Sequence, residues 1–262
     1  MIRSLSARRR AFYAGLALVA VVVAAVVAVA TRSPSRTRAI GVPIVVVAGY
    51  GGSAGSVDGL VAALRQSGRT VTVVVGADSG RGPIAASAAR LDAAIDDLAT
   101  GEVDLVGYSA GGVIVRFWTS LQGRSARPRR IITVGSPHHG TALADSLTGL
   151  SPTDCVAACA ELRPGSALLR GLAAGDETPT DAEWTSIWTA DDETVVPPQT
   201  AVLAGARNIR LQDRCPALRV SHSGLVTDAR VLRLIVSAVD FGAGEPGAGD
   251  PGASEPAPAA NC

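Results

Sequence analysis

One serine stands between glycines at the junction of two apolar segments. Residues 107–111 read Gly-Tyr-Ser-Ala-Gly, with the apolar run "VDLV" before them and "GVIV" after them. In a G-x-S-x-G sequence at a sharp strand-to-helix turn, the glycines leave room for the crossing backbone, and the serine hydroxyl is exposed above the sheet edge. The spacing therefore predicts that Ser109 is a nucleophile. The alternative is a tight turn without a catalytic role.

A serine nucleophile needs a base, and the chain contains only three histidines. His222 lies in "VSHSGL", after the last expected strand, where the chain order serine, acid, histidine places the base. We therefore expect His222 to take the proton of Ser109. His138 and His139, in "GSPHHGT", precede every candidate acid. They are candidates for lining the substrate site, with packing inside a loop as the alternative.

The acid that orients the base should follow a strand after Ser109. The segment "WTADDETVV" offers Asp191, Asp192 and Glu193. A run of carboxylates is usually a solvated turn, but one of them directed inward would fix the tautomer of the imidazole. We expect Asp192 in this role, with Asp191 as the alternative.

Two backbone N–H groups are needed to hold an oxyanion. The N–H of Ala110, directly after Ser109, is the first. The second is expected from the glycine-rich loop "AGYGGS" after the first strand, and we choose the N–H of Tyr50. The alternative for this loop is phosphate binding, but the sequence lacks the lysine of a P-loop and the spacing of a dinucleotide fingerprint.

Strand patterns alternate with helix patterns along the part of the chain that carries these residues. This alternation predicts an α/β fold, with a mostly parallel, doubly wound sheet and helices on both faces. The expected strands lie within residues 42–50, 69–76, 102–109, 129–136, 183–190 and 206–213, and the expected helices within 56–68, 84–100, 111–123 and 227–239.

The alternation is interrupted at residues 136–183, which we expect to form a cap-like insertion in a domain over residues 42–241. Leu162, Leu168 and Leu169 of this insertion either cover an acyl chain or pack onto the sheet. The Gly-, Pro- and acid-rich residues 242–262 are expected to be a disordered tail.

Residues 11–30 carry no charge and follow an arginine-rich start. Twenty helical residues span the hydrocarbon core of about 30 Å. We expect either a retained N-terminal membrane anchor or a signal peptide that is cleaved near Ala30. Both export the remainder of the chain past the linker at 31–41, so the folded part should be extracytoplasmic.

The four cysteines suit an oxidising compartment. We expect one bridge from Cys155 or Cys159 to Cys215, with Cys262 unpaired, and no zinc site because no histidine lies near them at ligand spacing. Residues 1–38 hold seven arginines and no acid, which leaves 17 arginines against 23 Asp and Glu in the remainder. This negative balance disfavours nucleic acid as a partner.

Several motifs in order resemble the small secreted lipases of the α/β-hydrolase superfamily, the class 2 triacylglycerol lipase type. The resemblance covers residues 42–239 and rests on "VPIVVVAGYGG", "GYSAGG", "VGSPHHGT", "WTSIWTADDETVVPP", "ARNIRLQD" and "VSHSGL".

The resemblance implies the nucleophile at Ser109, the acid at Asp192, the base at His222 and oxyanion donors at Tyr50 and Ala110. It also implies hydrolysis of carboxylic esters, lipid or acylglycerol esters among them, without a metal or organic cofactor. The sequence departs from the family in one place, because Ala48 stands where these lipases usually carry a histidine that orders the oxyanion loop.

The main expectation is thus an exported, monomeric serine hydrolase. The same three residues would also serve an acyltransferase or a thioesterase. An acyltransferase differs in the acceptor of the acyl group, and a thioesterase in cleaving a thioester. A non-catalytic, membrane-tethered binding protein with this fold is a further alternative, motivated by Ala48.

Overall fold

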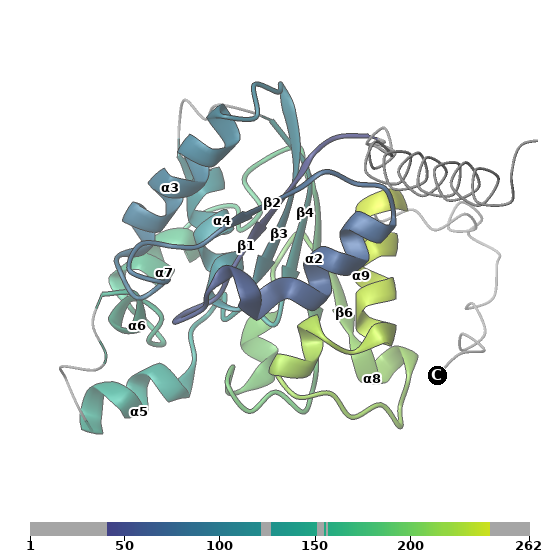
Figure 1. The fold of residues 1–262 in the computed structure, drawn as a ribbon. Helices are drawn as coiled ribbons and strands as arrows, with labels where there is room; N and C mark the ends of the chain where they lie inside the picture. Colours follow the sequence, from purple (N-terminus) through teal and green to yellow (C-terminus); the bar gives the residue numbers. More distant parts are fainter. Residues whose placement is uncertain (1–40, 122–126, 151–154, 156, 242–262) are drawn as a thin grey trace, which may run out of the picture. The chain divides into compact units, whose positions relative to one another are not determined.

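The computed structural model describes residues 41–121, 127–150, 155 and 157–241. Within these residues six parallel strands form one sheet in the order β2-β1-β3-β4-β5-β6 (Figure 1). The expected parallel α/β sheet is confirmed. The strands are β1 Ile44–Val47, β2 Val71–Val74, β3 Glu102–Tyr108, β4 Arg127–Val134, β5 Glu183–Trp188 and β6 Arg207–Arg210.

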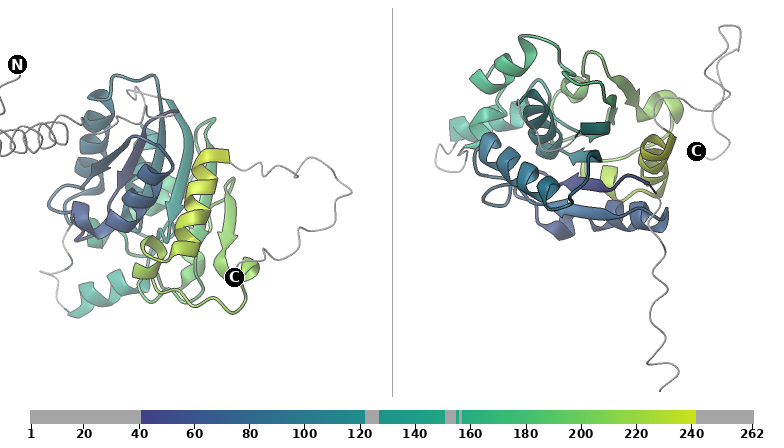
Figure 2. Two further views of the ribbon diagram at one scale, coloured as in Figure 1. Left: turned by 45° about the vertical axis from the view of Figure 1, so that its right-hand side comes forward. Right: turned by 90° about the horizontal axis from the view of Figure 1, so that it is seen from above.

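Helices cover both faces of this sheet (Figure 2). One face carries α2 and α9, and the other carries α3 and α4. The main helices are α2 Asp58–Gln66, α3 Ile84–Asp96, α4 Ala110–Ser120 and α9 Ala229–Phe241; the shorter ones are η1 Ala54–Val57, α5 Ala142–Leu150, α6 Ala158–Glu161, α7 Ala167–Ala173, η2 Pro198–Ala201, α8 Leu211–Arg214 and η3 Ser223–Val226.

The sequence of β1, an interior strand of the sheet, is apolar throughout because both of its faces are covered. Ile44 and Val46 pack into the core beneath α2 and α9, while Val45 and Val47 pack into the core beneath α3 and α4. All four residues are fully buried. A strand that is covered on both faces has no solvent side, so an alternating pattern of polar residues is absent.

Helix α4 is buried on nearly its whole circumference, because it lies between the sheet and a group of short helices. Ile114 and Trp118 pack with the sheet and α3, whereas Ala110 and Val113 belong to a third apolar cluster that includes residues of α5, α6 and α7. We call α5, α6 and α7 the cap helices. They arise from the segment in which the sequence pattern is interrupted.

The cysteine pairing differs from the expectation. Cys155 and Cys159 form a disulfide with each other, so neither is bonded to Cys215. Their Cα atoms lie 5.0 Å apart, because the two residues are four positions apart at the start of α6, and this separation suits a disulfide. Cys215 is also disulfide-bonded. Cys262 lies outside the described residues.

A buried cluster of ion pairs lies at the amino end of the sheet. Asp104 in β3 has no exposed surface, and its carboxylate lies 2.5 Å from Arg69 and 2.6 Å from Arg129. Arg69 also contacts Asp240 at the end of α9, at 2.7 Å. The cluster thus joins β3, β4, the turn before β2 and α9 at the end of the sheet opposite to Ser109.

The predicted membrane helix at 11–30 and the predicted tail at 242–262 lie outside the described residues. In the described part of the chain, no helix has both the length and the apolar character that crossing a bilayer requires.

Candidate active site

Ser109 occupies a sharp turn between β3 and α4. Its backbone has a φ of 54°, a value that non-glycine residues rarely adopt. A Cβ on Gly107 would lie 2.5 Å from the Cα of Gly112, and a Cβ on Gly111 would lie 2.2 Å from the carbonyl oxygen of Val47. The glycines are therefore needed because strand, turn and helix backbones touch here, which is the steric reason inferred from the motif.

A continuous chain of hydrogen bonds connects Ser109 with His222 and Asp192. The Ser109 Oγ lies 2.9 Å from the His222 Nε2, and the His222 Nδ1 lies 2.8 Å from the Asp192 Oδ2. A carboxylate only accepts hydrogen bonds, so Nδ1 carries the proton and Nε2 is left to accept the serine proton. The structure thus brings together the three residues that the sequence had placed in three separate segments.

The three adjacent acids point to different partners. The second carboxylate oxygen of Asp192 accepts the backbone N–H groups of Thr194 and Val195 at 2.9 and 2.7 Å, which fixes the orientation of the buried side chain. Asp191 accepts a hydrogen bond from the side chain of Gln212. Of these acids, only Asp192 contacts the imidazole; Glu193 accepts the backbone N–H of His222 at 2.9 Å.

Tyr108 also holds the histidine, a contact that the sequence did not reveal. Its hydroxyl donates a hydrogen bond to the carbonyl oxygen of His222 at 3.2 Å, and the two rings stack with centroids 5.1 Å apart. Burial, with the charges of Asp192 and Glu193 in addition, raises the pKa of Tyr108 well above its ordinary value. The only signal in the sequence was an aromatic residue at the variable position before Ser109.

An apolar cavity opens beside Ser109. Tyr50 and Ala110 line it together with Ser109, so the two expected oxyanion donors lie at the serine. The N–H of Ala110 begins α4 and is one of the N–H groups for which a helix has no internal acceptor. The other lining residues are Pro137, Thr141, Leu143, Ala144, Leu147, Cys159, Leu162, Thr194 and Val195.

His138 and His139 do not border this cavity, contrary to the expectation that they line the substrate site. His138 is fully buried, and its Nε2 lies 3.0 Å from the hydroxyl of Thr133. Burial, followed by the charge of Arg116, lowers the pKa of His138 well below its usual value, so the ring is neutral. His139 is directed outward to Glu177, at 2.8 Å. Both residues therefore support loops.

Arg116 joins helix α4 to the end of the cap helices. Its side chain is 1% exposed, and it donates to the carbonyl oxygens of Leu172, His138 and Glu177 and to the Glu177 carboxylate at 3.0 Å. The signal in the sequence was one charge within the apolar helix "GVIVRFW", which requires a buried counter-charge.

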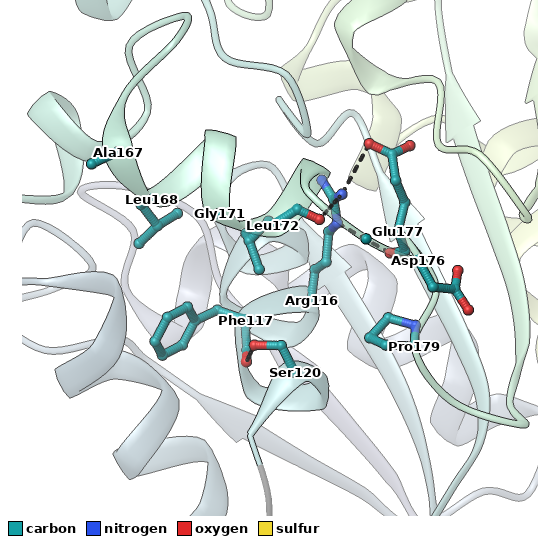
Figure 3. A pocket seen from close by; sticks show the side chains of 11 residues that line it. Arg116, Phe117, Ser120, Ala167, Leu168, Gly171, Leu172, Asp176, Glu177 and Pro179 are labelled. Carbon is teal, nitrogen blue, oxygen red and sulfur yellow. Dashed lines mark hydrogen bonds and ion pairs between the residues drawn. The ribbon is translucent and has the colours of Figure 1, made fainter.

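A second cavity, of about 450 Å³, lies where Arg116 meets α7 (Figure 3). Figure 3 shows Arg116 and Glu177 paired on one wall, with Phe117 and Leu168 on the other side. Each of the three Arg116 nitrogens already donates to a protein acceptor, so the arginine supports the cap here and does not serve as an anion site.

No cluster of three or more His, Cys, Asp or Glu side chains with the arrangement of a metal site occurs among the described residues.

No model of a known protein family matches the sequence, and no curated protein matches it. Solved structures do resemble it. The mature Bacillus licheniformis lipase BlEst2 is similar with a TM-score of 0.56 and 18% identity, over 78% of this chain and 94% of that one. The α/β hydrolase MGS-MChE2, from a lagoon sediment metagenome, has a TM-score of 0.53 and 19% identity, over 78% and 94%.

The esterase EaEST from Exiguobacterium antarcticum is similar with a TM-score of 0.54 and 16% identity, over 76% of this chain and 92% of that one. At such identities the likeness establishes the fold. The described chain therefore has the α/β-hydrolase fold, as its sheet order and helix arrangement also indicate.

Proposed function

We propose that this protein is a serine hydrolase that cleaves carboxylic esters. The observation that carries the proposal is the hydrogen-bonded chain from Ser109 through His222 to Asp192, with distances of 2.9 and 2.8 Å. Nucleophile, base and orienting acid in this geometry form the constellation that performs acyl transfer through serine, and such a site is recognised by this geometry on any fold.

The reaction follows from the positions of the side chains. The Ser109 oxygen attacks the ester carbonyl carbon while its proton passes to the His222 Nε2, and Asp192 stabilises the imidazolium. The N–H groups of Ala110 and Tyr50 hold the oxyanion. His222 then gives the proton to the departing alcohol. Water, activated by the same histidine, cleaves the acyl-enzyme and frees Ser109.

The substrate class that we propose is a lipid or acylglycerol ester. Support comes from the motifs that resemble class 2 triacylglycerol lipases and from the cavity beside Ser109, whose lining residues include no carboxylate and no cationic side chain. An uncharged acyl group suits such a lining, whereas a charged substituent would lose its hydration without a compensating partner.

We also propose that the enzyme works outside the cytoplasm, on a retained anchor or after cleavage near Ala30. The Cys155–Cys159 disulfide supports an oxidising compartment. An alkaline phosphatase fused after residue 40 should be active in a bacterial host. Activity in the membrane fraction would indicate a retained anchor, and activity released into the medium would indicate a cleaved signal peptide. An inactive fusion would contradict export.

Labelling with a fluorophosphonate probe tests the catalytic proposal. The wild-type protein should react at Ser109, identified by peptide mass spectrometry, and should hydrolyse p-nitrophenyl butyrate. The Ser109→Ala variant should do neither. Ser56→Ala is the matched control, because Ser56 is an exposed serine whose hydroxyl only bonds the nearby Ser53 carbonyl. Labelling that persists in Ser109→Ala would overturn the proposal.

A further inference from the structure

The cavity beside Ser109 is small compared with a long acyl chain. Its volume is about 70 Å³, whereas pockets that enclose drug-sized ligands measure roughly 300–1,000 Å³. The cavity is therefore well below the size that would enclose a long acyl chain.

This cavity lies on the acyl side of the reaction. Tyr50 and Ala110, the proposed oxyanion donors, line it, whereas His222 is not among its lining residues. Since the base must give its proton to the departing alcohol, the alcohol leaves on the side of His222. The acyl chain then extends away from His222, into the cavity.

The cap helices form part of the cavity wall. Cys159 and Leu162 line the cavity from α6 and its end, and each is almost completely buried. Cys159 is bonded to Cys155. The Leu162 carbonyl accepts the N–H of Thr141 at 3.0 Å, and its own N–H donates to the carbonyl of Ala158 at 2.9 Å.

This wall also belongs to a continuous apolar cluster. Leu162 belongs to one apolar cluster with Ala110 and Val113 of α4, Ala144 of α5 and Leu169 of α7. A longer acyl chain would have to displace the side chain of Leu162 within this cluster. Close-packed interiors do not yield in this way without a cost.

We propose that Leu162 is the specificity-determining residue of this site and that it disfavours long acyl groups. This inference rests on the proposed ester hydrolysis and narrows it to short-chain esters, such as butyrates.

The test is a comparison of kcat/KM for p-nitrophenyl acetate, butyrate and octanoate, with the full-length enzyme. For the wild type, kcat/KM for octanoate should be at least about tenfold lower than for butyrate, because a single methylene group that does not fit already lowers kcat/KM by about that factor. Leu162→Ala should raise the ratio of octanoate to butyrate by about tenfold.

Leu172→Ala is the matched control. Leu172 packs against the same apolar cluster but lines the second cavity and not the one beside Ser109. It should leave the ratio of octanoate to butyrate at the wild-type value. Should Leu162→Ala fail to fold, Leu162→Phe provides the opposite change, because a larger side chain should lower the ratio of butyrate to acetate.

The outcomes separate this inference from the proposed function. An enzyme that labels at Ser109 and hydrolyses butyrate, but accepts octanoate equally well, overturns the chain-length limit and leaves the ester hydrolase standing. A folded Leu162→Ala or Leu162→Phe variant with the wild-type ratios also overturns it. Absence of both labelling and hydrolysis overturns the proposed function itself.

Discussion

The hydroxyl of Tyr108 donates a hydrogen bond to the backbone carbonyl of His222, and the ring of Tyr108 stacks on the imidazole. The residue before the proposed nucleophile therefore positions the proposed base. Burial, followed by the negative charges of Asp192 and Glu193, keeps the pKa of Tyr108 above its usual range. The phenol thus stays protonated and remains a donor across neutral pH.

We expect Tyr108→Phe to lower kcat by about three- to tenfold, since a neutral hydrogen bond contributes about 0.5–1.5 kcal/mol. KM should change little, because the hydroxyl points to His222 and not into the substrate cavity. Steady-state kinetics on a short-chain ester measure both values. Tyr108→Leu, which removes the stacked ring too, should be slower than Tyr108→Phe. Equal rates for Tyr108→Phe and wild type would show that the contact does not position His222.

The neighbouring aspartates allow a matched test of the acid. Asp192→Asn should reduce kcat by about 10⁴-fold, because the amide no longer holds the required tautomer of His222. Asp191→Asn, at which only the hydrogen bond from Gln212 is disturbed, should stay within about threefold of wild type. Kinetics on both variants, with circular dichroism to verify folding, decide between them. A larger loss in Asp191→Asn would show that the acid is Asp191.

Arg116→Met should lower the free energy of unfolding by about 3–5 kcal/mol, because it removes the cationic partner of the Glu177 carboxylate and leaves three carbonyl groups without the Arg116 donor. Arg163→Met is the control: its pair with Asp145 is solvent-exposed, with 43% and 56% of the side chains accessible. It should cost at most about 1 kcal/mol. Urea unfolding of both variants measures the difference, and similar midpoints would contradict the structural role of Arg116.

The anchoring of the cap should weaken in acid. Burial on its own would raise the pKa of Glu177, but the N–H of Ala204, the ring of His139 and the charge of Arg116 together lower it from 4.5. A carboxyl group whose pKa is lower in the folded state stabilises the fold above its unfolded pKa and loses that contribution as the pH falls through the folded value.

Stability should therefore decline as the pH falls from about 4.5, and Glu177→Gln should remove part of this decline. Thermal unfolding of both proteins between neutral and acidic pH measures it. The variant should be less stable at neutral pH, with the difference shrinking in acid. A difference that is constant with pH would exclude Glu177 as a source of the acid sensitivity.

Some residues of the candidate site could be predicted from the sequence more directly than others. The turn at Ser109 could be predicted because the G-x-S-x-G spacing marks a strand-to-helix turn in which the backbones come too close for a Cβ. His222 could be identified because the histidines are few and only this one follows the acids. The structure places Asp192 at the imidazole and Asp191 at Gln212. The sequence offered only the family pattern for preferring Asp192, since side-chain direction at a strand end depends on distant neighbours.

Features that depend on packing between distant segments were not predictable. Cys155 and Cys159 are only four positions apart, so a local bridge was available to them. That this bridge forms in place of one to Cys215 depends on where the cap segment lies relative to Cys215, which no local pattern encodes. The sequence left His138 and His139 between lining the substrate site and packing inside a loop, because the directions of adjacent loop residues are not encoded locally; His138 points inward to Thr133 and His139 outward to Glu177. The order of the strands and the size of the cavity also emerge only from the assembled sheet.

The buried cluster of Arg69, Asp104 and Arg129 lies at the end of β3 opposite to Ser109. Ionic contacts thus stabilise the amino end of the strand, while the proposed active site, with its loops and cap helices, lies at the carboxyl end. A chimaera that grafts a foreign cap between β4 and β5 should therefore keep this ionic cluster, and, where the graft retains the Leu172 and Glu177 acceptors of Arg116, should fold and acquire a new acyl preference.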